Sequence, residues 1–138
     1  MDHSAAAGLI ALCPYQLHCL DQETSRSPQL CLVDLRSFML YRKGTIKSSV
    51  NLYFPRMLIK KNVFSFAKSV ANLPGMSDRE KLSSWTADTI VLFDESSQTV
   101  DGDSQLRCIY QKMIEEGCNR PVFWLQGLFT AMGFLTSF

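Results

Sequence analysis

The chain lacks the residue patterns that usually mark a structural zinc site or a secretory signal. Its five cysteines are an odd number, and they are scattered without a C-x-x-C pair or a neighbouring histidine pattern. A structural zinc site is therefore not expected, and reduced thiols inside a cell are the default. The start of the chain carries Asp2 where a secretory signal would carry positive charges, so secretion is not expected either.

A long apolar run is also missing. Residues 121–138 carry no charged side chain, but polar side chains and two glycines interrupt them. A membrane-spanning helix needs about 20 predominantly apolar residues. A buried strand that runs into a buried helix explains these residues better, and no membrane partner is expected.

The composition is typical of one globular domain. The chain has 138 residues, of which 46% are hydrophobic and 20% are charged. We expect a single domain over residues 1–138 with a core from about residue 13 to residue 134, and we expect residues 1–12 to fray outside it. Residues 1–69 carry nine Lys and Arg against four Asp and Glu, whereas residues 70–138 carry five against nine. This division argues against a nucleic-acid partner and leaves room for a local basic patch that faces an acidic partner.

Apolar strand patterns alternate with helix patterns along the chain. The sequence predicts strands at residues 30–33, 50–53, 89–93 and 122–125. It predicts helices at residues 13–20, 37–41, 55–61, 63–71, 77–85 and 104–116, with Ser77 and Glu80 as a capping box. Such alternation favours an α/β fold, in which helices cover both faces of a parallel sheet.

The loop after the strand at residues 89–93 contains no nucleophile. In α/β domains, catalytic groups collect where loops leave the carboxyl ends of parallel strands. Residues 94–103 place four carboxylates and several hydroxyls there, without Cys, His, Lys or Arg. This composition indicates a surface that binds and does not react.

A signature at residues 34–52 resembles that of rhodanese-like domains, D-x-R-x-x-x-x-Y followed by G-x-I-x-x-A-x-N-L. The matching residues are Asp34, Arg36, Tyr41, Gly44, Ile46, Asn51 and Leu52, with Ser49 at the alanine position. The resemblance runs from about residue 13 to residue 134. It implies a central parallel sheet of about five strands with helices on both faces.

Within that superfamily, the chain is most similar to the non-catalytic (Cdc25-homology) domain that precedes the catalytic domain of MAP kinase phosphatases. The similarity rests on residues 55–61, on an inserted helix that ends at Trp85, and on the strand exit at residues 92–97. The insertion and Trp85 favour the N-terminal domain of fungal tyrosine-specific phosphatases over the animal dual-specificity enzymes.

The chain departs from an active rhodanese at two places. An active member carries Cys as the first residue of the loop after the fourth strand, whereas this chain has a degenerate loop that begins Asp94, Glu95, Ser96, Ser97. Cys108, which lies among apolar neighbours in the next helix, is interpreted as a packed core cysteine. Leu128 replaces the second glycine of the closing turn. The resemblance therefore implies no catalysis by this chain and no cofactor or metal.

The hypothesis of a binding surface rests on the basic helix predicted at residues 55–61. Arg56 and Lys60 are four residues apart and share one helix face, with Lys61 beside them. Taken alone, these residues favour an ordinary solvated face next to core aliphatics. The family resemblance implies instead that they dock into an acidic groove of a MAP kinase. The docking residues would be Arg56, Leu58, Ile59, Lys60 and Lys61. Arg42, Lys43 and Lys47 would enlarge this basic patch.

Two other features have structural interpretations. Asp34 at the end of a strand is expected to cap nearby backbone donors and to pair with Arg36. Trp85 and Trp124 are expected in the core.

Three classes of function remain open on these residues. The first is a regulatory module that recruits a MAP kinase to a phosphatase domain elsewhere in a longer polypeptide, in the cytoplasm or the nucleus. The second is an active rhodanese-fold enzyme, either a sulfurtransferase or a Cys-dependent phosphatase. The third is a domain that regulates its own phosphatase domain without binding the kinase. The sequence does not identify the kinase.

Overall fold

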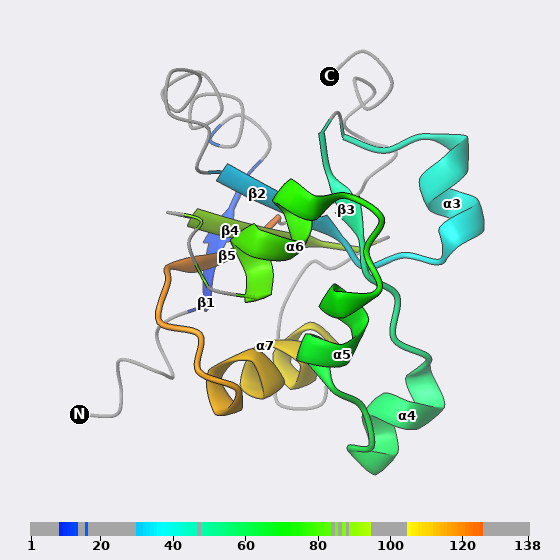
Figure 1. Ribbon diagram of the computed structural model, residues 1–138, viewed down its shortest axis with the longest axis vertical. Helices are drawn as coiled ribbons and strands as arrows, with labels where there is room; N and C mark the ends of the chain where they lie inside the picture. The colour runs from blue at the N-terminus through cyan, green and yellow to red at the C-terminus, as the bar shows by residue number, and fades with distance from the viewer. Residues whose placement is uncertain are drawn as a thin grey trace.

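The computed structural model describes residues 9–13, 16, 30–46, 48–83, 85, 87, 89–94 and 105–125. Five strands in this part of the chain form one parallel sheet in the order β1-β5-β4-β2-β3 (Figure 1). The strands are β1 (Leu9–Leu12), β2 (Leu30–Asp34), β3 (Val50–Asn51), β4 (Thr89–Phe93) and β5 (Val122–Leu125). The described helices are α3 (Phe38–Lys43), α4 (Arg56–Lys61), α5 (Phe66–Ala71), α6 (Met76–Ser83) and α7 (Gln105–Glu115). The predicted α/β fold with a parallel five-stranded sheet is confirmed.

The centre of the sheet follows directly from the apolar runs in the sequence. Strand β4 pairs with β2 on one side and with β5 on the other, and its residues 90–93 are at most 1% exposed. Parallel strands that are covered on both faces are continuous apolar segments and do not alternate with polar residues. The sequence TIVLF has this composition, so its assignment as a central strand was predictable.

One edge of the sheet differs from the prediction. The sequence pattern leaves residues 1–12 outside the core, but residues 9–12 form β1, which pairs with β5 from Leu9 opposite Val122 to Leu12 opposite Leu125. Leu12 is buried, while Ile10 is 48% exposed because β1 is the edge strand. The apolar run LIAL therefore belongs to the sheet, and the prediction of fraying is wrong for these four residues.

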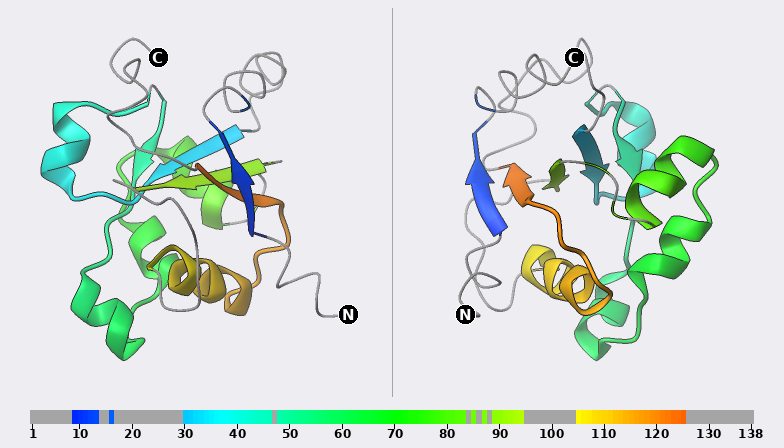
Figure 2. Two further views of the ribbon diagram at one scale, coloured as in Figure 1. Left: turned by 180° about the vertical axis from the view of Figure 1, so that it is seen from behind. Right: turned by 60° about the vertical axis from the view of Figure 1, so that its left-hand side comes forward.

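Helices α5, α6 and α7 pack together on one side of the sheet (Figure 2). The pattern of buried residues in helix α7 explains this packing. These residues are Leu106, Ile109, Tyr110 and Met113. These positions are three, four and seven residues apart, which places them on one helix face. They join strand residues and the buried side chains of α5 and α6 in the main hydrophobic core.

Two helix starts lie away from their predicted positions. Helix α5 begins at Phe66 instead of residue 63, because the Ser65 hydroxyl accepts a hydrogen bond from the Lys68 amide at 3.2 Å and caps the helix there. Helix α6 begins at Met76, and the Arg79 amide donates to the Gly75 carbonyl. Ser77 is thus already helical, so the predicted capping box at Ser77 is wrong.

The second face of the sheet carries a smaller cluster of buried residues. Strand residues of β1, β2, β4 and β5 form it together with Ile46 from the loop after α3. Most of the helix predicted at residues 13–20 and the whole segment from residue 126 onward, including Leu128, lie outside the described residues. Among the described helices, none has both the length and the apolar character needed to cross a membrane.

A carboxylate from the end of α7 holds the start of α5. Glu116 accepts hydrogen bonds from the backbone amides of Phe66 and Ala67 at 2.9 and 2.8 Å. The first amides of a helix have no partners within the helix, and a negative charge beside them is favourable. Nearby, the ring of Phe66 stacks on Trp85 with centroids 5.7 Å apart. The two contacts fix α5 against the core, and Trp85 and Trp124 both pack there as predicted.

We expect Glu116→Gln to lower the free energy of unfolding by about 1–2 kcal/mol, because the amide group leaves one helix donor without an acceptor. Glu115→Gln is the matched control, since the Glu115 side chain is 58% exposed and lies 3.7 Å from Lys112. Its loss should stay below about 0.5 kcal/mol. Urea unfolding of both variants measures the difference, and equal losses would contradict the capping role of Glu116.

Candidate docking surface and the carboxyl edge of the sheet

A cavity of about 420 Å³ lies at the carboxyl ends of β2 and β4, beside the start of α7. It is the place where a catalytic loop would lie in an active relative, as the sequence resemblance implies. Its lining residues are Leu35, Arg36, Ser37, Leu40, Tyr53, Arg56, Asp94 and Gln105. Asp94 follows β4 directly and is half-buried. Glu95, Ser96 and Ser97 lie outside the described residues.

A buried ion pair closes one wall of this cavity. Asp34 is fully buried at the end of β2, and its Oδ1 accepts from the backbone amide of Arg36 at 2.9 Å and from its Nε at 3.0 Å. Asp34 Oδ2 accepts from Arg36 Nη2 at 2.9 Å and from the Thr45 hydroxyl at 2.7 Å. Arg36 Nη2 also donates to the Gly44 carbonyl. This arrangement confirms that Asp34 caps backbone and pairs with Arg36.

The remaining polar residues of the signature extend the same network. The Tyr41 hydroxyl donates to the Ser49 carbonyl at 3.0 Å. The Asn51 side-chain amide donates to the backbone carbonyls of Asp34 and Arg36 at 3.0 and 2.8 Å. The motif that carries the resemblance therefore binds the segment between β2 and β3 to the end of the sheet. Its role is structural.

The described thiols do not line the cavity. Cys31 is buried in β2, where desolvation raises its pKa to about 12, and burial also raises the pKa of Cys118 after α7. Cys108 is half-buried in α7 and packs against the main core, as predicted. A thiol whose pKa is raised by burial carries little thiolate at neutral pH, so Cys31 and Cys118 are poor nucleophiles.

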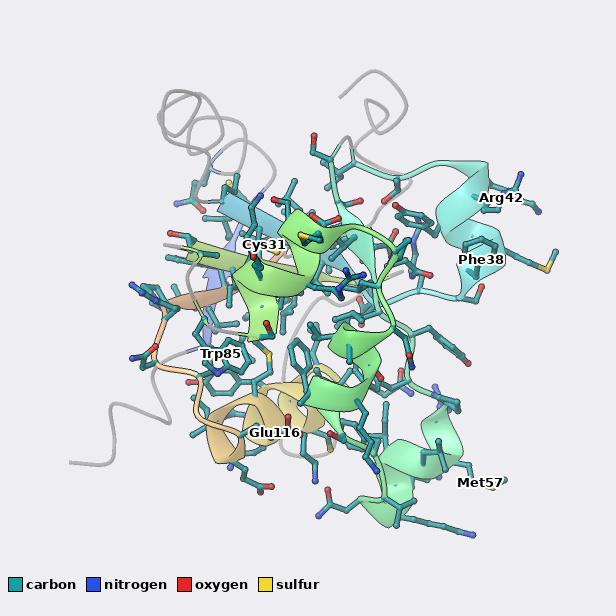
Figure 3. All side chains as sticks on the ribbon, in the orientation of Figure 1. Cys31, Phe38, Arg42, Met57, Trp85 and Glu116 are labelled. Atoms are coloured by element: carbon teal, nitrogen blue, oxygen red, sulfur yellow. The ribbon has the colours of Figure 1, made fainter. Side chains whose placement is uncertain are left out.

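Helix α4 presents three cations and two apolar side chains on the surface. Arg56, Lys60 and Lys61 are all exposed. Met57 is 65% exposed and points away from the molecule (Figure 3), and Leu58 is 38% exposed. The helix ends at Asn62, which adopts a left-handed conformation with φ 56° and whose amide donates to the Ile59 carbonyl. These five side chains thus form the α4 surface.

Ile59 does not belong to that surface. The prediction places it among the docking residues, but its side chain is only 6% exposed and packs in the main core. Ile59 is the only buried residue of α4, so this side chain attaches the helix to the core. The exposed aliphatic contact area therefore comes from Met57 and Leu58.

The other predicted cations lie elsewhere. Arg42 and Lys43 are exposed in the last turn of α3, where Arg42 lies over the Phe38 ring at 5.8 Å. Helices α3 and α4 occupy separate corners of the molecule (Figures 1 and 2), so these cations do not adjoin Lys60 and Lys61. Lys47 lies outside the described residues.

Comparison with known proteins agrees with this geometry. Residues 17–132 match the sequence pattern of the rhodanese-like domain family. The chain belongs to this family. A solved structure from Saccharomyces cerevisiae, described as a homolog of single-domain rhodanese and the Cdc25 phosphatase catalytic domain, has a TM-score of 0.54 and 20% identity. The superposition covers 95% of this chain and 84% of that one, which supports the fold.

Two relatives that the chain matches are phosphatases. Tyrosine-protein phosphatase 1 of Schizosaccharomyces pombe is 38% identical over 66 residues, which are 48% of this chain and 12% of that protein. Dual specificity protein phosphatase 6 of Rattus norvegicus is 30% identical over 107 residues, which are 74% of this chain and 28% of that protein. This domain is thus a relative of a domain in tyrosine and dual specificity phosphatases. It spans about a quarter or less of these two relatives.

Two residues have roles that the sequence does not predict. The sequence predicts a strand at Tyr53, yet this residue is 51% exposed and lines the carboxyl-edge cavity beside Arg56. Glu116 holds the start of α5, and its partners are backbone amides 49 and 50 residues away. No local pattern in the sequence identifies the role of either residue.

Asp34→Asn should be the most destabilising conservative change in the polar network, because it removes the negative charge that pairs with the buried Arg36 guanidinium. We expect a loss of about 3–5 kcal/mol in the free energy of unfolding. Thr45→Val removes a single hydrogen bond to the same carboxylate and should cost about 1 kcal/mol. Chemical denaturation of the two variants checks the order, and a loss for Asp34→Asn no larger than that for Thr45→Val would refute it.

Proposed function

We propose that this domain is the non-catalytic docking domain of a protein phosphatase and that it recruits a MAP kinase through helix α4. The kinship with tyrosine and dual specificity phosphatases supports the protein class. The observation that carries the docking role is the α4 surface, where Arg56, Lys60 and Lys61 stand beside exposed Met57 and Leu58.

The charges of the α4 surface are available to a partner. Arg56, Lys60 and Lys61 form no ion pair with any residue in the part of the chain that the structure describes. Exposed cations raise the rate of encounter with an acidic groove, and the adjoining apolar side chains supply contact area that excludes water. A kinase groove with carboxylates around a hydrophobic depression has the complementary chemistry.

The same proposal holds that the domain is not itself an enzyme. Residues 94–104 contain no cysteine, and Asp94 occupies the exit of β4. A carboxylate at this place disfavours the binding of thiosulfate or phosphate. Arg36, which lines the cavity, already neutralises Asp34. In the part of the chain that the structure describes, the cavity therefore offers no thiol for sulfur or phosphoryl transfer.

Reversing the charges of Arg56, Lys60 and Lys61 to Glu should weaken kinase binding by at least about 100-fold, since each exposed cation that meets a carboxylate would become repulsive. Isothermal titration calorimetry of this chain against a panel of purified MAP kinases measures the effect. The thermal unfolding midpoint should stay nearly unchanged, because all three side chains are exposed. Binding of the unmodified chain should weaken as salt is raised.

Two matched single variants distinguish docking through α4 from a general effect of the charge of the domain. Lys60→Glu and Lys68→Glu each reverse one exposed lysine, and Lys68 lies on α5 outside the α4 surface. Only Lys60→Glu should lower the affinity substantially. Equal effects of the two variants, or an unaltered affinity of the triple variant, would rule out α4 as the docking helix.

Absence of catalysis is tested by thiosulfate:cyanide sulfur transfer and by hydrolysis of p-nitrophenyl phosphate. We expect rates at the level of buffer alone for this chain and for Cys108→Ala, because no thiol lies at the carboxyl-edge cavity among the described residues. Turnover that disappears in Cys108→Ala would show that the domain is an enzyme and would identify its nucleophile.

A further inference from the structure

Helix α3 differs from the other described helices because none of its residues is buried. Met39 is 71% exposed and Phe38 is 58% exposed, and Met39 is the most exposed large hydrophobic side chain among the described residues. Single apolar side chains are common on protein surfaces. Two adjacent ones on a helix that buries none form an apolar patch, which the fold itself does not use.

The exposed side chains of α3 form one continuous face. Arg42 follows Phe38 by four residues and Lys43 follows Met39 by four, so the two pairs lie in neighbouring rows along the helix. Both cations are exposed, and the Arg42 guanidinium lies over the Phe38 ring at 5.8 Å. We call these four residues the α3 face. It presents apolar groups in the first turn and cations in the last turn.

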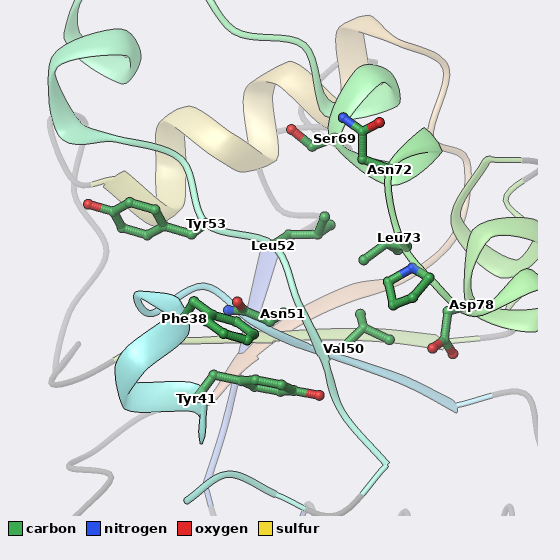
Figure 4. Close-up of a pocket in the computed structure, with 11 residues that line it drawn as sticks. Phe38, Tyr41, Val50, Asn51, Leu52, Tyr53, Ser69, Asn72, Leu73 and Asp78 are labelled. Atoms are coloured by element: carbon green, nitrogen blue, oxygen red, sulfur yellow. The ribbon is translucent and has the colours of Figure 1, made fainter. Parts of the chain in front are cut away.

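Polar contacts hold α3 in place. The Tyr41 hydroxyl donates to the Ser49 carbonyl at 3.0 Å, and Arg36 donates to the Gly44 carbonyl directly after the helix. The rings of Tyr41 and Phe38 stack with centroids 6.3 Å apart beside a hollow of about 360 Å³ next to β3 (Figure 4). The helix is thus attached through hydrogen bonds, and its exposed apolar side chains are pre-organised for a partner.

The charge of the surrounding sequence defines the chemistry of that partner. Residues 35–77, which include α3, α4 and α5, contain eight Lys and Arg and no Asp or Glu. Arg42 and Lys43 form no ion pair with any other residue that the structure describes. Such a face complements an acidic protein surface that carries an apolar depression.

Helices α3 and α4 border the same cavity. The carboxyl-edge cavity is lined by Leu40 of α3 and by Arg56 of α4. Arg42 and Met57 both point outward on the same side of the molecule (Figure 3). Asp94 is the only carboxylate among the described lining residues; it is half-buried and interacts with other groups of the chain. One partner surface that lies over this cavity can therefore contact both helices.

We propose that the α3 face is a second contact for the acidic partner of helix α4, so that one partner molecule spans the carboxyl-edge cavity between the two helices. The inference rests on the proposed function, but it concerns residues that docking through α4 does not require. Carboxylates of the partner face Arg42 and Lys43, and an apolar depression receives Met39 and Phe38. The partner therefore carries two acidic areas, one for each helix.

Charge reversal on α3 tests this contact by isothermal titration calorimetry against the same panel of purified MAP kinases. Lys43→Glu should weaken binding about 10-fold or more, because an attraction becomes a repulsion. Lys68→Glu is the matched control, since each lysine is exposed and lies in the last turn of a six-residue helix. The control should bind within about 2-fold of the unmodified chain. Equal losses for the two variants would overturn the proposal.

A second pair of variants tests the apolar half of the α3 face. Met39 and Met76 are 71% and 67% exposed, and Met76 lies on α6 outside this face. Met39→Gln should weaken kinase binding about 5-fold, whereas Met76→Gln should leave it unchanged. Both variants should keep the thermal unfolding midpoint of the unmodified chain, because both side chains are exposed. Unaltered affinity of Met39→Gln would refute the contact.

The stoichiometry and the α4 variants separate this inference from the proposed function. One kinase molecule per domain, with the fold-losses of Lys43→Glu and Lys60→Glu multiplying in the double variant, agrees with one partner on both helices. Two kinase molecules per domain would overturn the inference. A loss with Lys60→Glu and none with Lys43→Glu would remove α3 and leave docking through α4 in place. No binding of the unmodified chain to any kinase would end both proposals.

Discussion

The buried pair of Asp34 and Arg36 is the interaction on which the carboxyl edge of the sheet depends. Asp34 is fully buried, so its charge is tolerated only because Arg36, Thr45 and a backbone amide surround both of its oxygens. Asn51 ties the backbone of both residues to the edge strand. The buried guanidinium of Arg36 pairs with a carboxylate of the chain itself, and the network keeps α3 and β3 in place at this edge.

The central strands and the polar signature could be predicted from the sequence because each depends on neighbouring residues. The run TIVLF identifies β4, and Asp34 lies two positions from the arginine with which it pairs. The first strand escaped prediction because LIAL is short and its partner, β5, is more than 100 residues away in the chain. Helix starts moved by one to three residues where a serine or a glycine set the first turn. Neighbouring residues thus determine where the helices and strands form, while pairing between residues far apart in the chain determines which strand lies at the edge of the sheet.

The candidate sites were harder to predict than the fold. The pattern of α4 predicts that Arg56, Lys60 and Lys61 lie on the surface, as they do, but it does not say which aliphatic side chain enters the core, and in the structure this is Ile59. Arg42 and Lys43 are close to the signature in sequence, yet α3 carries them to another corner of the molecule. The hollow of about 360 Å³ beside β3 has no sequence pattern at all, since it is lined by residues from three separate segments, 38–41, 50–53 and 69–78. Such surfaces exist only once the chain is folded.

The attachment of α4 has a consequence for how this domain could diverge among its relatives. One side chain, Ile59, secures the helix, while the other five positions, occupied here by Arg56, Met57, Leu58, Lys60 and Lys61, are outside the core. Exchanges at exposed positions usually change stability by less than about 0.5 kcal/mol. The helix can therefore accumulate new charges and shapes without endangering the fold. Related domains could acquire different partners through substitutions at these five positions while one buried side chain keeps the helix in place.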